Sequence, residues 1–110
     1  MTQITFYKTS ADEYESFVCD GHAGFADYGQ DIVCASISVL VINTINALDD
    51  ITGEAIDVDA DEDTGRIRCR FMKLPLKETS RALMDSLVLG LTQIEKQYGK
   101  NYCKLTFEEV

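Results

Sequence analysis

Residues 32–42 read IVCASISVLVI, the longest apolar stretch in the chain. Apolar residues continue at Ile45, Ala47 and Leu48, so they lie on nearly every face of a helix predicted over residues 31–49. A helix that is apolar on every face has to be covered on every face, and a sheet covers only one side. The stretch therefore predicts a helix packed on a sheet and covered on its outer side by a second copy, as a homodimer. Coverage by the rest of the same chain is the alternative.

The segments around this helix alternate between apolar and polar residues, as strands do. The clearest is residues 66–72, where arginines alternate with apolar side chains. A second helix is predicted over residues 77–98, which carry one apolar stripe at helical spacing. The other strands are expected at residues 4–7, 14–20, 55–59 and 102–107. The order β-β-α-β-β-α-β predicts one α+β domain over residues 1–110, a sheet of about five strands carrying two helices.

Composition and charge narrow the class of protein. Hydrophobic residues make up 45% of the 110-residue chain, as in a globular domain, and the formal net charge is −9. This charge repels phosphate backbones, which argues against direct nucleic-acid binding, and attracts basic partners, although it also serves solubility alone. The apolar stretch is shorter than the ~20 residues that cross a bilayer, and no signal sequence precedes the first strand. A cytoplasmic protein without membrane association is expected.

The four cysteines do not have the spacing of a metal site, and there is only one histidine to join them, so no metal or other cofactor is expected. Cys19, Cys69 and Cys103 fall in predicted strands and are interpreted as buried, inert thiols. Cys34 differs, because it is expected to be the third residue of the helix that follows Asp31. Unpaired backbone N–H groups and the helix dipole favour a thiolate at that position.

The only histidine, His22, lies between the small residues Gly21 and Ala23, which leave room for a substrate beside the ring. A thiol needs a neighbouring base to react at neutral pH, and histidine is the usual one. We therefore interpret Cys34 as a nucleophile and His22 as its general base and acid. A Cys34 that only packs in its helix and a His22 at a strand end are the alternative.

Other candidates surround this pair. Asp31 either caps the helix or orients the imidazole of His22. Ser38 lies one turn beyond Cys34 and either lines the same pocket or bonds back to its own helix. The N–H groups of the first turn, that of Cys34 included, are candidates for an oxyanion hole.

The segment between the histidine and the helix is expected to be a loop that closes over the site. Its glycines, Gly24 and Gly29, permit such movement. Its aromatic residues, Phe25 and Tyr28, either grip an apolar substrate side chain or anchor the loop to the domain.

Gly21-His22-Ala23 followed by Asp31-Ile32-Val33-Cys34-Ala35 and by Ser38 resembles the motif of the ribosomal-processing cysteine protease family, called Prp. The resemblance covers essentially the whole chain, including its length, its order of elements and an acidic turn before residues 66–72. It implies a small bacterial cytoplasmic dimer with Cys34 and His22 as the catalytic residues. Gly21, Asp31 and Ser38 fall on the other motif positions.

The resemblance also implies a basic substrate, the twenty-seventh protein of the large ribosomal subunit. Members of the family remove its short N-terminal extension after an alanine that aromatic residues precede. Two alternatives remain open at this point. One is a non-catalytic, ribosome-associated binding protein with an inert Cys34, and the other is a thiol hydrolase that acts on a different substrate.

Overall fold

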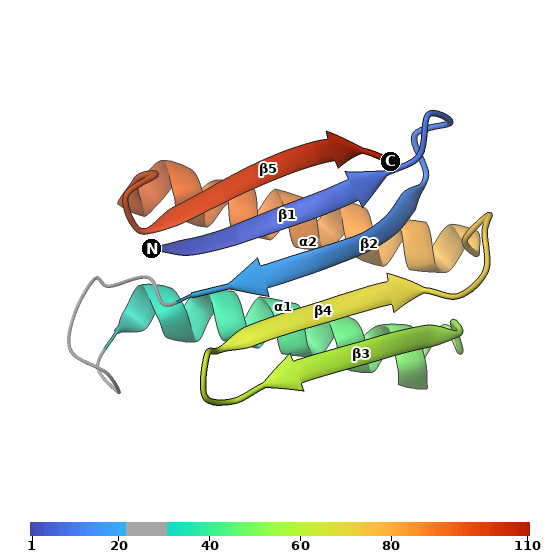
Figure 1. Ribbon diagram of the computed structural model, residues 1–110, viewed down its shortest axis with the longest axis horizontal. Coiled ribbons are helices and arrows are strands. Elements are labelled where there is room, and N and C mark those ends of the chain that lie inside the picture. The colour runs from blue at the N-terminus through green and yellow to red at the C-terminus, as the bar shows by residue number, and fades with distance from the viewer. Residues whose placement is uncertain (22–30) are drawn as a thin grey trace.

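A computed structural model describes residues 1–21 and 31–110, so His22 and the predicted loop lie outside the described residues. Every predicted element is present (Figure 1). The elements are β1 (Thr2–Lys8), β2 (Tyr14–Asp20), α1 (Ile32–Asp50), β3 (Ile56–Asp61), β4 (Arg66–Phe71), α2 (Glu78–Tyr98) and β5 (Cys103–Glu109). The predicted α+β domain with the order β-β-α-β-β-α-β is therefore confirmed.

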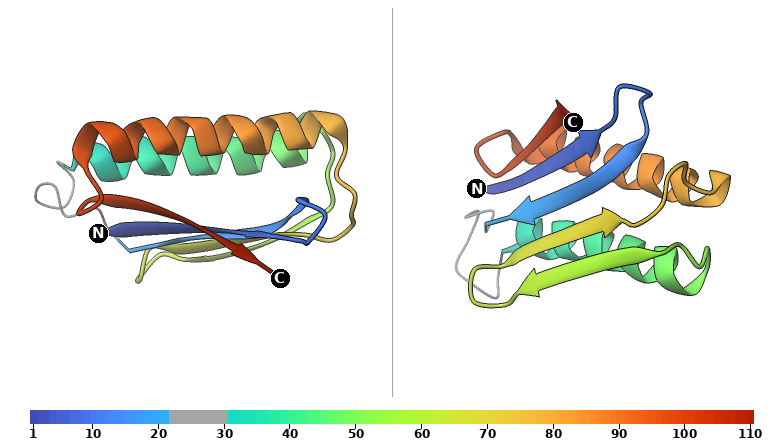
Figure 2. Two further views of the ribbon diagram at one scale, coloured as in Figure 1. Left: turned by 90° about the horizontal axis from the view of Figure 1, so that it is seen from above. Right: turned by 45° about the vertical axis from the view of Figure 1, so that its right-hand side comes forward.

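The described strands form one mixed sheet in the order β3-β4-β2-β1-β5. Neighbouring strands are antiparallel except β1 and β5, which run parallel, so the first and last strands of the chain lie side by side. Both helices lie on one face of this sheet (Figure 2). α1 crosses the β3–β4 half, whereas α2 lies toward β1 and β5 (Figure 1).

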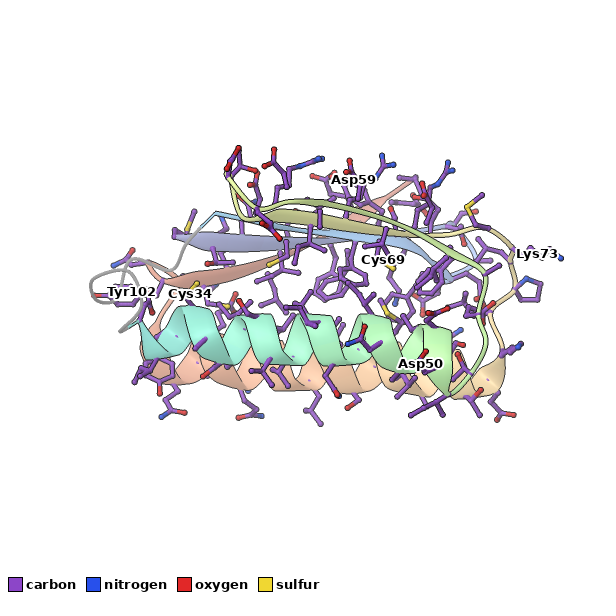
Figure 3. The ribbon with its side chains drawn as sticks, turned by 90° about the horizontal axis from the view of Figure 1, so that it is seen from below. Cys34, Asp50, Asp59, Cys69, Lys73 and Tyr102 are labelled. Carbon is purple, nitrogen blue, oxygen red and sulfur yellow. The ribbon has the colours of Figure 1, made fainter. Side chains whose placement is uncertain are left out.

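The face of the sheet away from the helices is polar. Register places three aspartates of β3 opposite three arginines of β4, in the pairs Asp57–Arg70, Asp59–Arg68 and Asp61–Arg66. Figure 3 shows Asp59 on this outer side and Cys69 in the layer between sheet and helices. Opposite charges across neighbouring strands are favourable, and their exposure leaves this face in solvent.

The core fills the space between the sheet and the helices (Figure 3). Phe6 is fully buried and its ring packs on Phe17, with 5.8 Å between the ring centroids. The helices meet closely at Gly90 of α2, where an added Cβ would lie 2.9 Å from Cδ1 of Leu40. Glycine at this position therefore lets α1 and α2 pack against each other while both cover the sheet.

The chain covers only one side of α1. Val33 and Ile37 are buried, but Ile32, Val39 and Ile42 are 54%, 67% and 48% exposed, so coverage of the whole helix within one chain is wrong. Beyond the apolar stretch, α1 continues to a length and composition that would suffice to cross a membrane, a criterion that core helices also meet. Its buried side packs like that of a core helix, against the sheet and α2.

Candidate active site

α1 begins at Ile32 because Asp31 caps it. Asp31 has an extended backbone, and its Oδ1 accepts a hydrogen bond from the N–H of Cys34 at 2.9 Å. The capping role predicted for Asp31 is confirmed. Its other predicted role, orienting an imidazole, involves His22, which lies outside the described residues.

The same hydrogen bond changes the prediction for the oxyanion hole. The N–H of Cys34 already donates to the carboxylate of Asp31, so it does not point at a substrate in this structure. The first N–H groups of a helix have no partner within the helix. Those of Ile32 and Val33 therefore remain the candidates at the start of α1.

Cys34 is the only one of the four cysteines that is not buried. Burial raises the pKa of Cys19 and Cys69 to about 12, and that of Cys103 to about 11. These three thiols are buried, as predicted, and stay protonated at neutral pH. The chain thus presents one accessible thiol, in the first turn of a capped helix.

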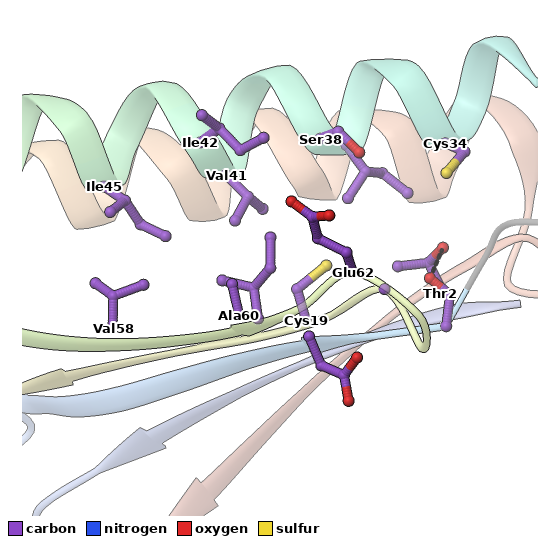
Figure 4. Close-up of a pocket in the computed structure, with 15 residues that line it drawn as sticks. Thr2, Cys19, Cys34, Ser38, Val41, Ile42, Ile45, Val58, Ala60 and Glu62 are labelled. Carbon is purple, nitrogen blue, oxygen red and sulfur yellow. Dashed lines mark hydrogen bonds between the residues drawn. The ribbon is translucent and has the colours of Figure 1, made fainter. Parts of the chain in front are cut away.

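A cavity of about 610 Å³ opens beside Cys34, between α1 and the neighbouring end of the sheet (Figure 4). α1 forms one wall with Cys34, Ser38, Ile42 and Ile45, which follow one another at about one helical turn. This volume lies within the range of pockets that hold small ligands and peptide side chains.

The opposite wall comes from strands and from the turn between β3 and β4. Val58 and Ala60 of β3 and Cys19 of β2 supply an apolar surface that faces α1 (Figure 4). Asp61, the last residue of β3, and Glu62, the next residue in the turn, are the only charged residues among the described lining. The carboxylate of Asp61 accepts hydrogen bonds from the N–H groups of Asp63 and Thr64 within the turn, so Glu62 supplies the acidic side chain that reaches toward α1 (Figure 4). The cavity is therefore an apolar groove with an acidic end near the thiol.

Ser38 lines the groove, as one of its two predicted roles requires. The back-bond expected of it as the other role is made by Ser36 instead, which donates to the carbonyl of Ile32 at 2.7 Å. Among the described residues, no such bond involves Ser38. Its hydroxyl therefore belongs to the groove wall (Figure 4).

Gly21 also lines the groove, at the end of β2. Its φ of +88° is one that side chains rarely adopt, and a Cβ there would lie 2.6 Å from the carbonyl oxygen of Met1. The backbone conformation and the close approach of Met1 thus require glycine at this position. This reason is additional to the room for a substrate that the sequence suggested.

His22, Gly24, Phe25, Tyr28 and Gly29 lie outside the described residues, and their predicted roles stay predictions. The residues that bracket this segment are described. Gly21 lines the same groove as Cys34, and Asp31 is hydrogen-bonded to Cys34. In the described part of the chain, no cluster of His, Cys, Asp and Glu side chains is able to hold a metal ion.

Sequence reasoning missed the sheet side of the groove. Cys19 was expected to be a core thiol only, Val58 and Ala60 were assigned no role, and Glu62 was part of an acidic turn. One signal was available. Pairing the strands around that turn as a hairpin places Val58 on the same face as Cys69, toward the helices.

Several known proteins are similar to this chain. The family model of cysteine protease Prp matches residues 1–103. The ribosomal processing cysteine protease Prp of Bacillus subtilis is 30% identical over 104 residues, 92% of this chain and 93% of that protein. Its namesake from Staphylococcus aureus is 31% identical over 84 residues, 76% of this chain and 78% of that protein.

A solved structure shares the fold. It is the crystal structure of the essential ribosomal processing protease Prp from S. aureus in complex with a covalently linked product peptide. The two structures match with a TM-score of 0.91 and 25% identity, covering 98% of this chain and 100% of the other. The match of the family model over nearly the whole length, together with the two relatives, shows that this chain belongs to the Prp family of ribosomal processing cysteine proteases.

Proposed function

We propose that this protein is a cysteine endopeptidase that removes the N-terminal extension of a large-subunit ribosomal protein, the twenty-seventh of its set, during ribosome maturation. The observation that carries the proposal is the placement of Cys34, the one accessible thiol, at the start of α1 and on the wall of a groove. The S. aureus relative, with its covalently linked product peptide, supports a covalent mechanism.

The proposed reaction is acyl transfer. The Cys34 thiolate attacks the carbonyl carbon of the scissile peptide bond, and N–H donors at the start of α1 hold the oxyanion. His22, protonated when the thiol ionises, gives its proton to the departing amine as the C–N bond breaks. Water then attacks the thioester while His22 accepts its proton, which releases the acid and restores the thiol. His22 is joined directly to Gly21, a residue of the groove, which supports its role.

Charge supports a basic substrate. The chain carries a net charge of −9, and the charged side chains among the described residues of the groove are both acidic. Such a surface attracts a basic ribosomal protein and repels nucleic acid. None of the four cysteines forms a disulfide bond, which favours the reducing cytoplasm as the protein's place of action.

We also propose a homodimer that covers the outer side of α1. Ile32 and Val39 are more than half exposed there, and a second copy would bury them. Light scattering should give twice the chain mass for the wild type and the chain mass for Val39→Lys. Leu89→Lys on α2, at a site of similar exposure, is the matched control and should stay dimeric. A monomeric wild type would contradict this assembly.

The decisive experiment incubates the protein with a peptide that spans the ribosomal extension and the mature start, followed by mass spectrometry. The wild type should cut one bond, and Cys34→Ala and His22→Ala should each lower the rate by at least about a thousandfold. Cys69→Ala, which removes a buried thiol, is the control for loss of a cysteine and should keep its activity.

Circular dichroism spectra must show that each variant is folded. Cleavage retained in both Cys34→Ala and His22→Ala would overturn the catalytic assignment. No cleavage by a folded wild type would instead favour the binding role with an inert Cys34.

A further inference from the structure

We propose that Thr2 is a positioning residue of the active site: its hydroxyl holds the carbonyl group of Gly21, and thereby the point from which the chain continues to His22. The inference rests on the proposed function, because it takes His22 as the base that acts on Cys34. It adds a residue that the sequence did not single out, since Thr2 precedes the strand expected at residues 4–7.

A polar residue interrupts the apolar side of β1. The side chains of β1 that face the helices are those of Thr2, Ile4 and Phe6, which are 2%, 0% and 0% exposed. Burying a hydroxyl is unfavourable unless it forms a hydrogen bond, and valine has the same shape without the polar group. Packing alone therefore favours valine at this position, so the hydroxyl of Thr2 serves another purpose.

Thr2 lies at the same end of the cavity as the proposed nucleophile. Both residues line the cavity, and Figure 4 shows Cys34 on α1 and Thr2 on the sheet across from it. Gly21, which follows the last residue of β2, lines the cavity as well. A small shift of the backbone at Gly21 therefore alters the site itself.

The hydroxyl of Thr2 donates a hydrogen bond to the carbonyl oxygen of Gly21, with 3.4 Å between the two oxygens. The pairing of β1 with β2 runs as far as Gln3 and Asp20, so Gly21 lies just beyond the ladder. Hydrogen bonds in active sites are often long without substrate and shorten when it binds. The side chain of Thr2 thus extends the hold of β1 on the chain by one residue.

The direction of this carbonyl matters because the residue is glycine. Glycine has the least restricted backbone, and Gly21 has a φ of +88°. A peptide bond is planar, so the direction of the Gly21 carbonyl also sets the direction in which the chain leaves toward His22. Misplacing a catalytic group by about 1 Å costs up to about a hundredfold in rate. Loss of the hydroxyl therefore frees a backbone rotation directly before the base.

Thr2 is itself held from the side opposite to β2. Its N–H donates to the carbonyl oxygen of Tyr102 at 3.0 Å, and its register partner in β5 is the fully buried Cys103. A group anchored on paired strands holds its neighbour more precisely than a group on a loop. The position of the hydroxyl is therefore fixed by the sheet.

The test compares two substitutions of Thr2 in the peptide-cleavage assay. Thr2→Val keeps the shape and removes the hydroxyl, and it should lower kcat by roughly threefold to tenfold while KM stays within about twofold of the wild type. Thr2→Ser keeps the hydroxyl and should restore most of the lost kcat. Thr5→Val makes the same change in β1 on the opposite face of the sheet and is the matched control. Urea unfolding confirms that each variant is folded.

A double-mutant cycle shows whether Thr2 acts through His22. The readout is the rate at which iodoacetamide alkylates Cys34 at neutral pH, which requires no peptide. Thr2→Val should lower this rate in the wild-type background and have no further effect in His22→Ala, because the base that it positions is absent. Equal effects in both backgrounds would show that Thr2 does not act through the base, and would overturn the inference.

The outcomes separate this inference from the proposed function. If a folded wild type cuts no peptide, the proposed function fails, and the alkylation cycle still decides the role of Thr2. If the wild type cuts the peptide but Thr2→Val behaves like Thr5→Val, the positioning role is wrong. A rise in KM at unchanged kcat would assign Thr2 to substrate binding, and a Thr2→Ser variant as slow as Thr2→Val would show that the hydroxyl is not the cause. Either result contradicts the proposal.

Discussion

The two helices lie on the same face of the sheet but differ in how their apolar residues are distributed. α2 is amphipathic, with a buried stripe that includes Met84, Leu87 and Leu91. α1 is apolar on both its buried and its exposed sides, and it carries the accessible thiol. α2 has no side-chain cap at Lys77, whereas Asp31 caps α1 within one turn of Cys34.

This difference distinguishes residues that are needed for packing from residues that are needed for function. α2 follows the pattern that packing alone requires, so its residues serve the core. α1 also has apolar residues on its solvent-exposed side. Exposed apolar residues lower solubility, and packing within the chain does not explain why they are there. Departures from the simple pattern therefore mark the helix that serves the groove and the proposed dimer.

The largest expected effect on stability tests whether α2 serves the core and α1 serves the site. Leu91→Ala removes a fully buried side chain of α2 and should lower the free energy of unfolding by about 2–5 kcal/mol. The folded molecules should still alkylate Cys34 with iodoacetamide at the wild-type rate. Urea unfolding and alkylation rates measure the two effects. A slowed alkylation under conditions where the variant is folded would show that α2 also shapes the site.

The buried thiols give an alkaline effect of intermediate size. In the unfolded chain they titrate near 9.0, whereas burial keeps Cys69 protonated in the folded chain up to a pKa of about 12. Between these values the unfolded state has lost a proton that the native state retains, so the free energy of unfolding falls as pH rises from 9 toward 11, by up to about 1.4 kcal/mol per pH unit for each thiol.

Urea midpoints at pH 8, 9, 10 and 11 measure this slope. Cys69→Ala should have a shallower slope than the wild type, each protein being compared with its own value at pH 8. Identical slopes would contradict the contribution of that thiol. Below pH 9 both states keep the proton, and the two slopes should agree.

The smallest effect concerns the cap of α1. Asp31→Ala loses the hydrogen bond to the N–H of Cys34 and should lower the free energy of unfolding by about 1 kcal/mol. Asp31→Asn keeps a capping oxygen and should keep the stability of the wild type. Thermal unfolding measures both variants. Peptide cleavage by Asp31→Asn then isolates the charge, and its loss would assign Asp31 the imidazole-orienting role as well.

Most of the fold was predictable because its signals are local. Alternation in residues 66–72 and the stripe in residues 77–98 each bury one face, and tertiary packing agrees with both. The neighbours of each strand were harder to predict, since the parallel pairing of β1 with β5 depends on contacts between the two ends of the chain.

The site was predictable only on its α1 side. The cap at Asp31, Cys34 in the first turn and Ser38 one turn later follow from helical geometry. The hairpin pairing shows that Val58 faces the helices, but the edge position of β3, which places Val58 at the groove, depends on the order of the strands in the sheet and not on a local pattern. The hydrogen bond from the Cys34 N–H to Asp31 was foreseeable, since a capping side chain and an oxyanion compete for the same N–H group.

The parallel pairing of β1 with β5 has a consequence for synthesis of the protein. Phe6 stacks on Phe107, with 5.4 Å between the ring centroids, and Val110 donates a backbone hydrogen bond to Lys8. Until β5 has been synthesised and has paired, β1 lacks this neighbour and remains an open edge. Long-range closure of this kind is slow and exposes apolar surface until it is complete. The sheet is therefore complete only once β5 has paired with β1, and truncation within β5 should cause aggregation rather than partial activity.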